Sequence, residues 1–101
     1  MRQLSASQLK DWLADTERTR PVLLDVREPN EHALAHIPQA RLLPLATLPE
    51  HLDTLPRDRE ILIHCKAGGR SAKAVQLLLD NGFTRVKNVS GGMDAWLEQG
   101  W

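Results

Sequence analysis

Cysteine is scarce in this sequence, which contains only Cys65. One cysteine cannot form an internal disulfide, and its isolation agrees with a reducing compartment. Long hydrophobic runs are also absent, so the sequence predicts no membrane-spanning segment. Residues 1–5 lack the hydrophobic centre of a signal peptide. We therefore expect a cytoplasmic protein that does not bind a membrane.

Charge of one sign is not in excess either, because 13 basic residues are balanced by 13 acidic residues. This balance gives no reason to expect nucleic acid or an anionic membrane as a partner. The composition, 42% hydrophobic and 26% charged, is typical of a globular protein. No repeat, linker or low-complexity segment divides the 101 residues. We therefore expect one domain over residues 1–101.

Short apolar segments alternate with amphipathic segments along the chain, and this alternation predicts an α/β fold. Strands are expected at Leu4 and over residues 21–26, 41–44, 61–64 and 86–89. Helices are expected over residues 5–15 and 30–36, after residues 47 and 71, and after Gly92. The runs 21–26 and 61–64 are apolar throughout, as in strands that are buried on both faces. The sequence thus predicts an open, mostly parallel sheet of about five strands with helices on both faces.

Three helix starts are predicted from capping residues. Ser5-Ala6-Ser7-Gln8 and Thr47-Leu48-Pro49-Glu50 both have the form of a capping box. Ser71 is the expected cap of the helix that follows Cys65. At the other end of that helix, Asn81-Gly82 predicts a left-handed C-terminal cap.

The only cysteine lies where the apolar run 61–64 ends and the glycine-containing turn 65–70 begins. Gly68 and Gly69 can adopt φ values that other residues resist, so successive N–H groups of the turn can point inward. The unpaired amides of the following helix would point at the same space. Lys66 and Arg70 add two positive charges. Each of these features favours thiolate over thiol, so we expect a depressed pKa for Cys65.

Three motifs carry a resemblance to a known family. They are Cys65-x-x-Gly68-x-Arg70-Ser71, then Leu24-Asp25-Val26-Arg27-Glu28 with His36-Ile37-Pro38, and Gly91-Gly92-Met93-Asp94-Ala95-Trp96. In this order and spacing, the sequence resembles a single-domain rhodanese, a family of sulfurtransferases. The resemblance extends over nearly the whole chain and implies the rhodanese fold.

The resemblance also implies a reaction and its residues. Cys65 would attack the outer sulfur of thiosulfate, carry that sulfur as a persulfide and pass it to a thiol or cyanide by ping-pong kinetics. The residues expected to bind the substrate follow it directly: Lys66, Ala67, Gly68, Gly69, Arg70 and Ser71. Another persulfide could be the donor, and a protein could be the acceptor. No cofactor and no metal are expected, because Cys65 and His64 have no second ligand pair at suitable spacing.

Two other functions are kept as alternatives. Cysteine phosphatases and arsenate reductases also combine a Cys and an Arg in an anion-binding loop, but their familiar loop has five residues between the two. This chain has four, residues 66–69. A regulatory, docking or redox-sensing module is the second alternative, because an accessible cysteine of low pKa is readily oxidised.

Several polar residues near the predicted strand ends have more than one possible role. Asp25, Arg27 and Glu31 are interpreted as structural, pairing and capping the neighbouring loops. His36 is interpreted as fixing a turn, and His64 is expected to point away from the cysteine because strand side chains alternate. Lys66 and Arg70 can each contact substrate or stay outside the site, as a surface side chain or as a support of the loop.

Overall fold

Residues 2–100, which the computed structural model describes, form one parallel sheet with the strand order β1-β5-β4-β2-β3. The strands are β1 (Gln3–Leu4), β2 (Val22–Asp25), β3 (Arg41–Leu42), β4 (Ile61–His64) and β5 (Val86–Val89). Every neighbouring pair is parallel, with β4 in the centre between β2 and β5. The five-stranded sheet confirms the predicted fold class, and the short β3 lies at an edge as expected of a strand that is stopped by a proline.

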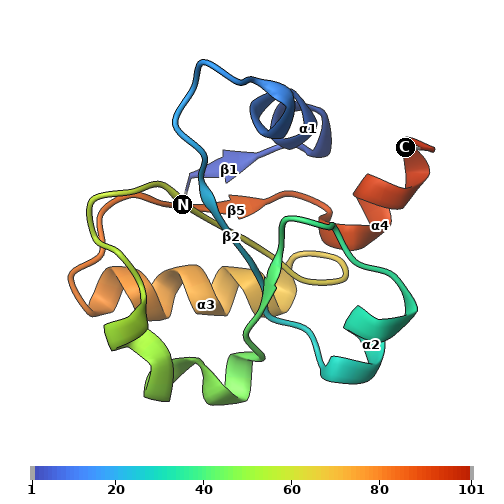
Figure 1. Ribbon diagram of the computed structural model, residues 1–101. Helices are drawn as coiled ribbons and strands as arrows, with labels where there is room; N and C mark the ends of the chain where they lie inside the picture. The colour runs from blue at the N-terminus through green and yellow to red at the C-terminus, as the bar shows by residue number, and fades with distance from the viewer. Residues whose placement is uncertain (1, 101) are drawn as a thin grey trace.

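Helices cover both faces of this sheet, as predicted. They are α1 (Ala6–Ala14), α2 (Pro29–Leu34), the 3₁₀ helix η1 (Leu45–Thr54), α3 (Gly69–Asp80) and α4 (Gly92–Glu98). Figure 1 shows α1 and α4 on one side of the strands, and α3 with the green η1 segment on the other. The short α2 lies near the carboxyl ends of β2 and β4, so it can reach the loop that follows β4.

The central strand β4 is fully buried and contributes to two hydrophobic clusters. Ile61 and Ile63 pack with α3 and η1 on one face, whereas Leu62 packs with α1 and α4 on the other. This follows from the alternation of side chains along a strand. Because both faces of β4 are anchored in this way, the residue that follows it, Cys65, is held at a fixed place at the carboxyl end of the sheet.

Two of the predicted helix caps have different outcomes. Ser5 and Gln8 form the expected capping box, with a bond from the Gln8 N–H to the Ser5 hydroxyl of 3.1 Å. The box predicted at Thr47 is wrong: η1 begins after Pro44, and the Thr47 hydroxyl donates to the Pro44 carbonyl over 2.9 Å. Pro49 lies inside η1 and has no N–H to donate, which explains why a regular α-helix does not form here.

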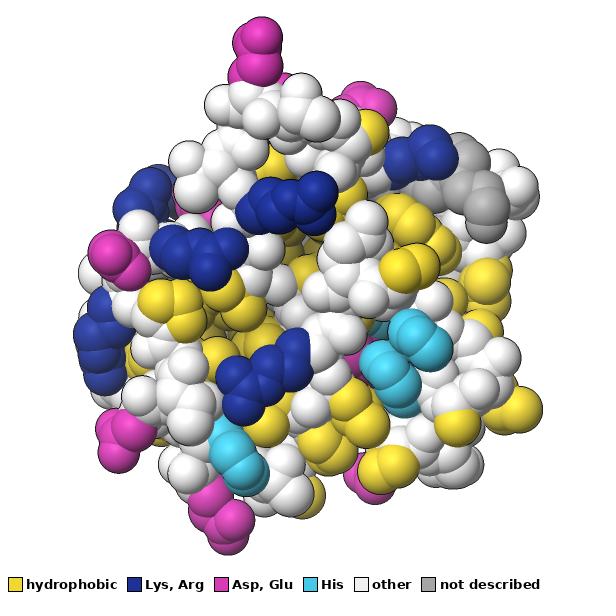
Figure 2. All heavy atoms as spheres, in the orientation of Figure 1, with side chains coloured by type: hydrophobic (Ala, Val, Ile, Leu, Met, Phe, Trp, Pro, Cys, Tyr) yellow, Lys and Arg dark blue, Asp and Glu magenta, His cyan; other side chains and the backbone are white. Residues whose placement is uncertain are grey.

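The surface carries charges of both signs. On the face shown in Figure 2, basic side chains lie over the middle, acidic side chains lie towards the edges, and hydrophobic side chains are visible between them. This mixing agrees with the equal numbers of basic and acidic residues. Between residues 2 and 100, none of the helices has the length and apolar character that crossing a membrane requires.

Candidate active site

The turn after β4 changes direction through one glycine. Gly68 has a φ of +122°, which side chains rarely tolerate, and it caps α3, whose first residue is Gly69. The expected role of Ser71 as the cap is therefore wrong, because Ser71 is the third residue of the helix. The reason is that the turn closes earlier than predicted, and this places the Ser71 hydroxyl inside the site rather than at its entrance.

Hydrogen-bond donors surround the sulfur of Cys65. The Gly68 N–H donates to Sγ over 3.0 Å, and the Ser71 Oγ lies 3.3 Å from Sγ. Cys65 itself is only 1% exposed. Burial raises the pKa of the Cys65 thiol, but the Ser71 hydroxyl and the amides of Ser71, Gly68 and Ala67 outweigh it, so the pKa is lowered overall. The predicted direction of the pKa shift is thus confirmed.

The first two carbonyl groups of the loop, those of Cys65 and Lys66, bond with α4. The Met93 N–H donates to the Cys65 carbonyl over 2.8 Å, and the Asp94 N–H donates to the Lys66 carbonyl over 3.0 Å. The first turn of α4 therefore satisfies these two acceptors, and the amides that follow them are free to face inward. Gly92 makes this approach possible, because no side chain separates it from the loop backbone.

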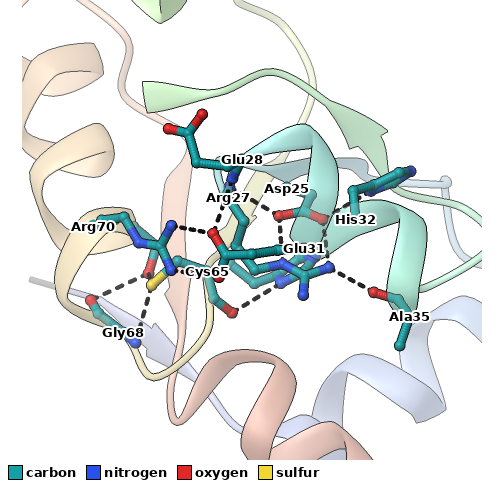
Figure 3. A network of polar contacts seen from close by, with 11 residues as sticks. Asp25, Arg27, Glu28, Glu31, His32, Ala35, Cys65, Gly68 and Arg70 are labelled. Atoms are coloured by element: carbon teal, nitrogen blue, oxygen red, sulfur yellow. Dashed lines mark hydrogen bonds and ion pairs between the residues drawn. The ribbon is translucent and has the colours of Figure 1, made fainter. Parts of the chain in front are cut away.

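Both cations of the loop have carboxylate partners. Arg70 forms a two-pronged ion pair with Glu31, with distances of 2.6 and 2.9 Å. Figure 3 shows the Arg70 guanidinium directed at the Glu31 carboxylate. The hydrogen bonds from Arg70 lower the pKa of Glu31 to about 2. Lys66 lies 3.1 Å from Asp94 in an exposed pair, so it is the more solvated of the two cations.

A buried ion pair holds α2, the helix that carries Glu31. The Asp25 carboxylate accepts from the backbone N–H, Nε and Nη2 of Arg27 over 3.0, 2.9 and 2.8 Å. Arg27 also donates to the Ala35 carbonyl at the end of α2 (Figure 3). Burial raises the pKa of Asp25, but the Arg27 and His32 bonds lower it to about 2. The structural roles predicted for these residues are therefore confirmed.

One known protein family matches almost the whole length of the chain. A model described as the rhodanese-like domain matches residues 5–99. The chain belongs to the rhodanese-like family. A sulfurtransferase from Allochromatium vinosum is 38% identical over 98 residues, which cover 97% of this chain and 90% of that protein. The resemblance inferred from the three motifs is thus confirmed.

Solved rhodanese structures agree with this fold. A rhodanese-like domain protein from Staphylococcus aureus has a TM-score of 0.88 and 38% identity, covering 95% of this chain and 91% of that chain. A rhodanese-related protein from Thermoplasma volcanium also has a TM-score of 0.88, with 32% identity, and covers all of this chain and 95% of that chain. Together with the named relative, they support a general sulfurtransferase role for this rhodanese-like domain.

The loop of this rhodanese-like domain brings the backbone amides of three predicted site residues to one sulfur atom. The amides of Ala67, Gly68 and Ser71 are directed at it, whereas the side chains of Lys66 and Arg70 extend to acidic partners on α4 and α2. Gly69 begins α3 with an ordinary φ, so only one of the two loop glycines has the positive φ that favours glycine. Their roles in substrate binding stay predictions.

Two residues near the cysteine were not singled out from the sequence. Asn88 of β5 accepts a bond of 2.6 Å from the Ser71 hydroxyl, and Asp94 of α4 pairs with Lys66. The only signal for Asn88 was a polar residue in the strand predicted over residues 86–89. His64 is directed at the Cys65 carbonyl and not its sulfur, with Nδ1 3.2 Å from that oxygen. Its burial lowers its pKa, so it is held neutral.

Proposed function

We propose that the chain is a thiosulfate sulfurtransferase that carries sulfur as a Cys65 persulfide. The observation that carries this proposal is the position of the Cys65 sulfur within bonding distance of the Gly68 amide and the Ser71 hydroxyl. A thiolate is the form that attacks a sulfur donor, and these donors stabilise it without a base or a metal. A reducing compartment such as the cytoplasm keeps a lone cysteine from being oxidised, and it is the location we propose.

The reaction consists of two balanced half-reactions. In the first, the Cys65 thiolate attacks the outer sulfur of thiosulfate, a new sulfur–sulfur bond forms, and sulfite leaves with the electron pair of the old one. The persulfide then carries the single negative charge that the thiolate had. In the second, cyanide or a thiolate attacks the outer sulfur and regenerates the Cys65 thiolate. Because the first product leaves before the acceptor reacts, ping-pong kinetics are expected.

The loop amides suit the persulfide because its charge lies on the outer sulfur. Amides that already point into the loop need no rearrangement when this charge forms, so they stabilise it more than water would. The close spacing of Cys65 and Arg70 gives a small loop. Such a loop fits one added sulfur better than a tetrahedral oxyanion, and this favours sulfur transfer over a phosphatase reaction.

Mass spectrometry of the intact protein tests the proposal directly. After incubation with thiosulfate and removal of small molecules, we expect a mass gain of one sulfur atom, located on Cys65 by peptide analysis. Cyanide should then remove this mass and release thiocyanate. A phosphatase or a docking module predicts no gain, so an unchanged mass under these conditions would reject sulfur transfer from thiosulfate.

Replacing Arg70 tests how the anionic donor is bound. We expect Arg70→Ala to raise the KM for thiosulfate by about tenfold or more, because a charge-assisted contact contributes roughly 1.5–3 kcal/mol to binding. Steady-state kinetics with varied thiosulfate measure the change. Lys73→Ala is the matched control, since Lys73 is an exposed cation of the same helix α3. Equal KM values for the two variants would show that Arg70 only braces the loop against Glu31.

A further inference from the structure

Asn88 is a buried polar side chain that has no role in the two half-reactions. It lies in β5 beside β4, opposite Ile63, and is only 4% exposed. An amide in such a strand costs stability unless it has hydrogen-bond partners. Its Oδ1 accepts the 2.6 Å bond from Ser71, and its Nδ2 faces the loop, 4.0 Å from where a Gly68 side chain would begin.

The Ser71 hydroxyl connects Asn88 to the cysteine. Ser71 is fully buried, and three groups surround its oxygen: Asn88 Oδ1 at 2.6 Å, the Gly68 carbonyl at 3.2 Å and Cys65 Sγ at 3.3 Å. A hydroxyl has one proton to donate and two lone pairs that can accept. It therefore cannot donate to Asn88 and to the sulfur at the same time.

The protonation state of Cys65 decides which arrangement is satisfied. A thiol can donate to the Ser71 oxygen while Ser71 donates to Asn88, so the chain of bonds is complete. A thiolate or persulfide anion has no proton and needs Ser71 as a donor, and the 2.6 Å bond to Asn88 then has to break. The Ser71 oxygen lies closer to Asn88 Oδ1, at 2.6 Å, than to the Cys65 sulfur, at 3.3 Å. A Ser71 proton shared with Asn88 is the arrangement that suits the thiol.

We propose that Asn88 is a positioning residue that competes with the Cys65 sulfur for the single proton of Ser71. This inference rests on the proposed function, because it assigns Asn88 to the same nucleophile. While Cys65 is protonated, Ser71 donates its proton to Asn88. When the anion forms, the Ser71 proton turns to sulfur, and the loop amides and Ser71 then act together.

The ion pairs around the sulfur do not have to change when the Ser71 proton turns from Asn88 to the sulfur. Arg70 of α3 stays paired with Glu31 of α2, and Lys66 stays paired with Asp94 of α4. The buried Asp25 of β2 has its own partners in Arg27 and His32, and His64 of β4 faces the Cys65 carbonyl. An effect of Asn88 on the thiol therefore has one short route, through Ser71.

A double-mutant cycle tests this route. The protein has one cysteine and no tyrosine, so its ultraviolet thiolate absorbance against pH reports Cys65 without interference from tyrosinate. We expect Asn88→Ala to lower the Cys65 pKa by about one unit, since it removes the competitor for a bond to a charged group. Asn88→Asp keeps the shape but accepts more strongly, so it should raise the pKa by about one unit or more.

The same substitutions in a Ser71→Ala background complete the cycle. There, Asn88→Ala should leave the pKa unchanged, and Asn88→Asp should show only the smaller direct effect of its charge. Equal shifts in both backgrounds, or no shift of the Asn88→Ala variant with Ser71 present, would overturn the proposal. A purely structural Asn88 would change the thermal midpoint and not the titration. The titration needs no sulfur donor, so it gives its answer even where the thiosulfate experiment is negative.

Discussion

Cys65→Ser should reduce sulfur transfer from thiosulfate at least about a thousandfold, the scale expected when a nucleophile is lost. A serine hydroxyl stays protonated at neutral pH, and it cannot form the sulfur–sulfur bond on which the persulfide depends. The inward amides of the loop, whose first two carbonyls are bound by α4, do not supply a nucleophile of their own. Thiocyanate formation from thiosulfate and cyanide measures the loss.

The fold should survive this change. Serine has almost the shape of cysteine, and the hydroxyl can bond with Gly68 and Ser71 as the sulfur does. The circular dichroism spectrum should be unchanged, so that the loss of turnover is assigned to chemistry. Turnover at the wild-type rate in a folded Cys65→Ser protein would refute the persulfide mechanism, because no other cysteine is present to replace it.

The fold can be predicted well from the sequence because local patterns define its elements. The run 61–64 is apolar throughout, and the structure buries all four residues as the central strand. The capping box at Ser5 was predicted correctly for the same reason, since both partners lie within one turn. The capping box predicted at Thr47 does not form, although its residues match the motif equally well. Whether Thr47 begins a helix or lies inside one depends on how Pro44 and Pro49 direct the chain, and a four-residue motif does not contain that information.

The backbone geometry of the active-site loop could be predicted from the loop's own sequence. The inward amides and the lowered pKa of Cys65 follow from a strand, a glycine turn and a helix start. The side-chain partners could not be predicted, because they come from distant parts of the chain. Ser71 and Asn88 are 17 positions apart, and Glu31 and Arg70 are 39 apart. Only the parallel sheet and the docking of α2 bring these groups together.

Gly92→Ala should strongly lower the stability of the protein. Gly92 has a φ of +53°, and an added Cβ would overlap the Cys65 carbonyl oxygen and lie 2.7 Å from the Lys66 carbonyl oxygen. Both obstacles are backbone atoms, which cannot turn aside as a flexible side chain does. The left-handed φ and the overlap together should cost roughly 3 kcal/mol or more in the free energy of unfolding. Urea denaturation followed by circular dichroism measures this cost.

The site should suffer together with stability. To relieve the overlap, α4 has to move away, and its Met93 and Asp94 amides then release the carbonyls of Cys65 and Lys66. Those carbonyls are then free to turn towards the sulfur, so the Cys65 pKa should rise in any folded Gly92→Ala protein. Gly69→Ala is the matched control for stability. It has an ordinary φ and nothing within 4 Å of its Cβ position, so its free energy of unfolding should change by less than about 1 kcal/mol. Equal stability of the two variants would show that the close approach of α4 does not hold the loop.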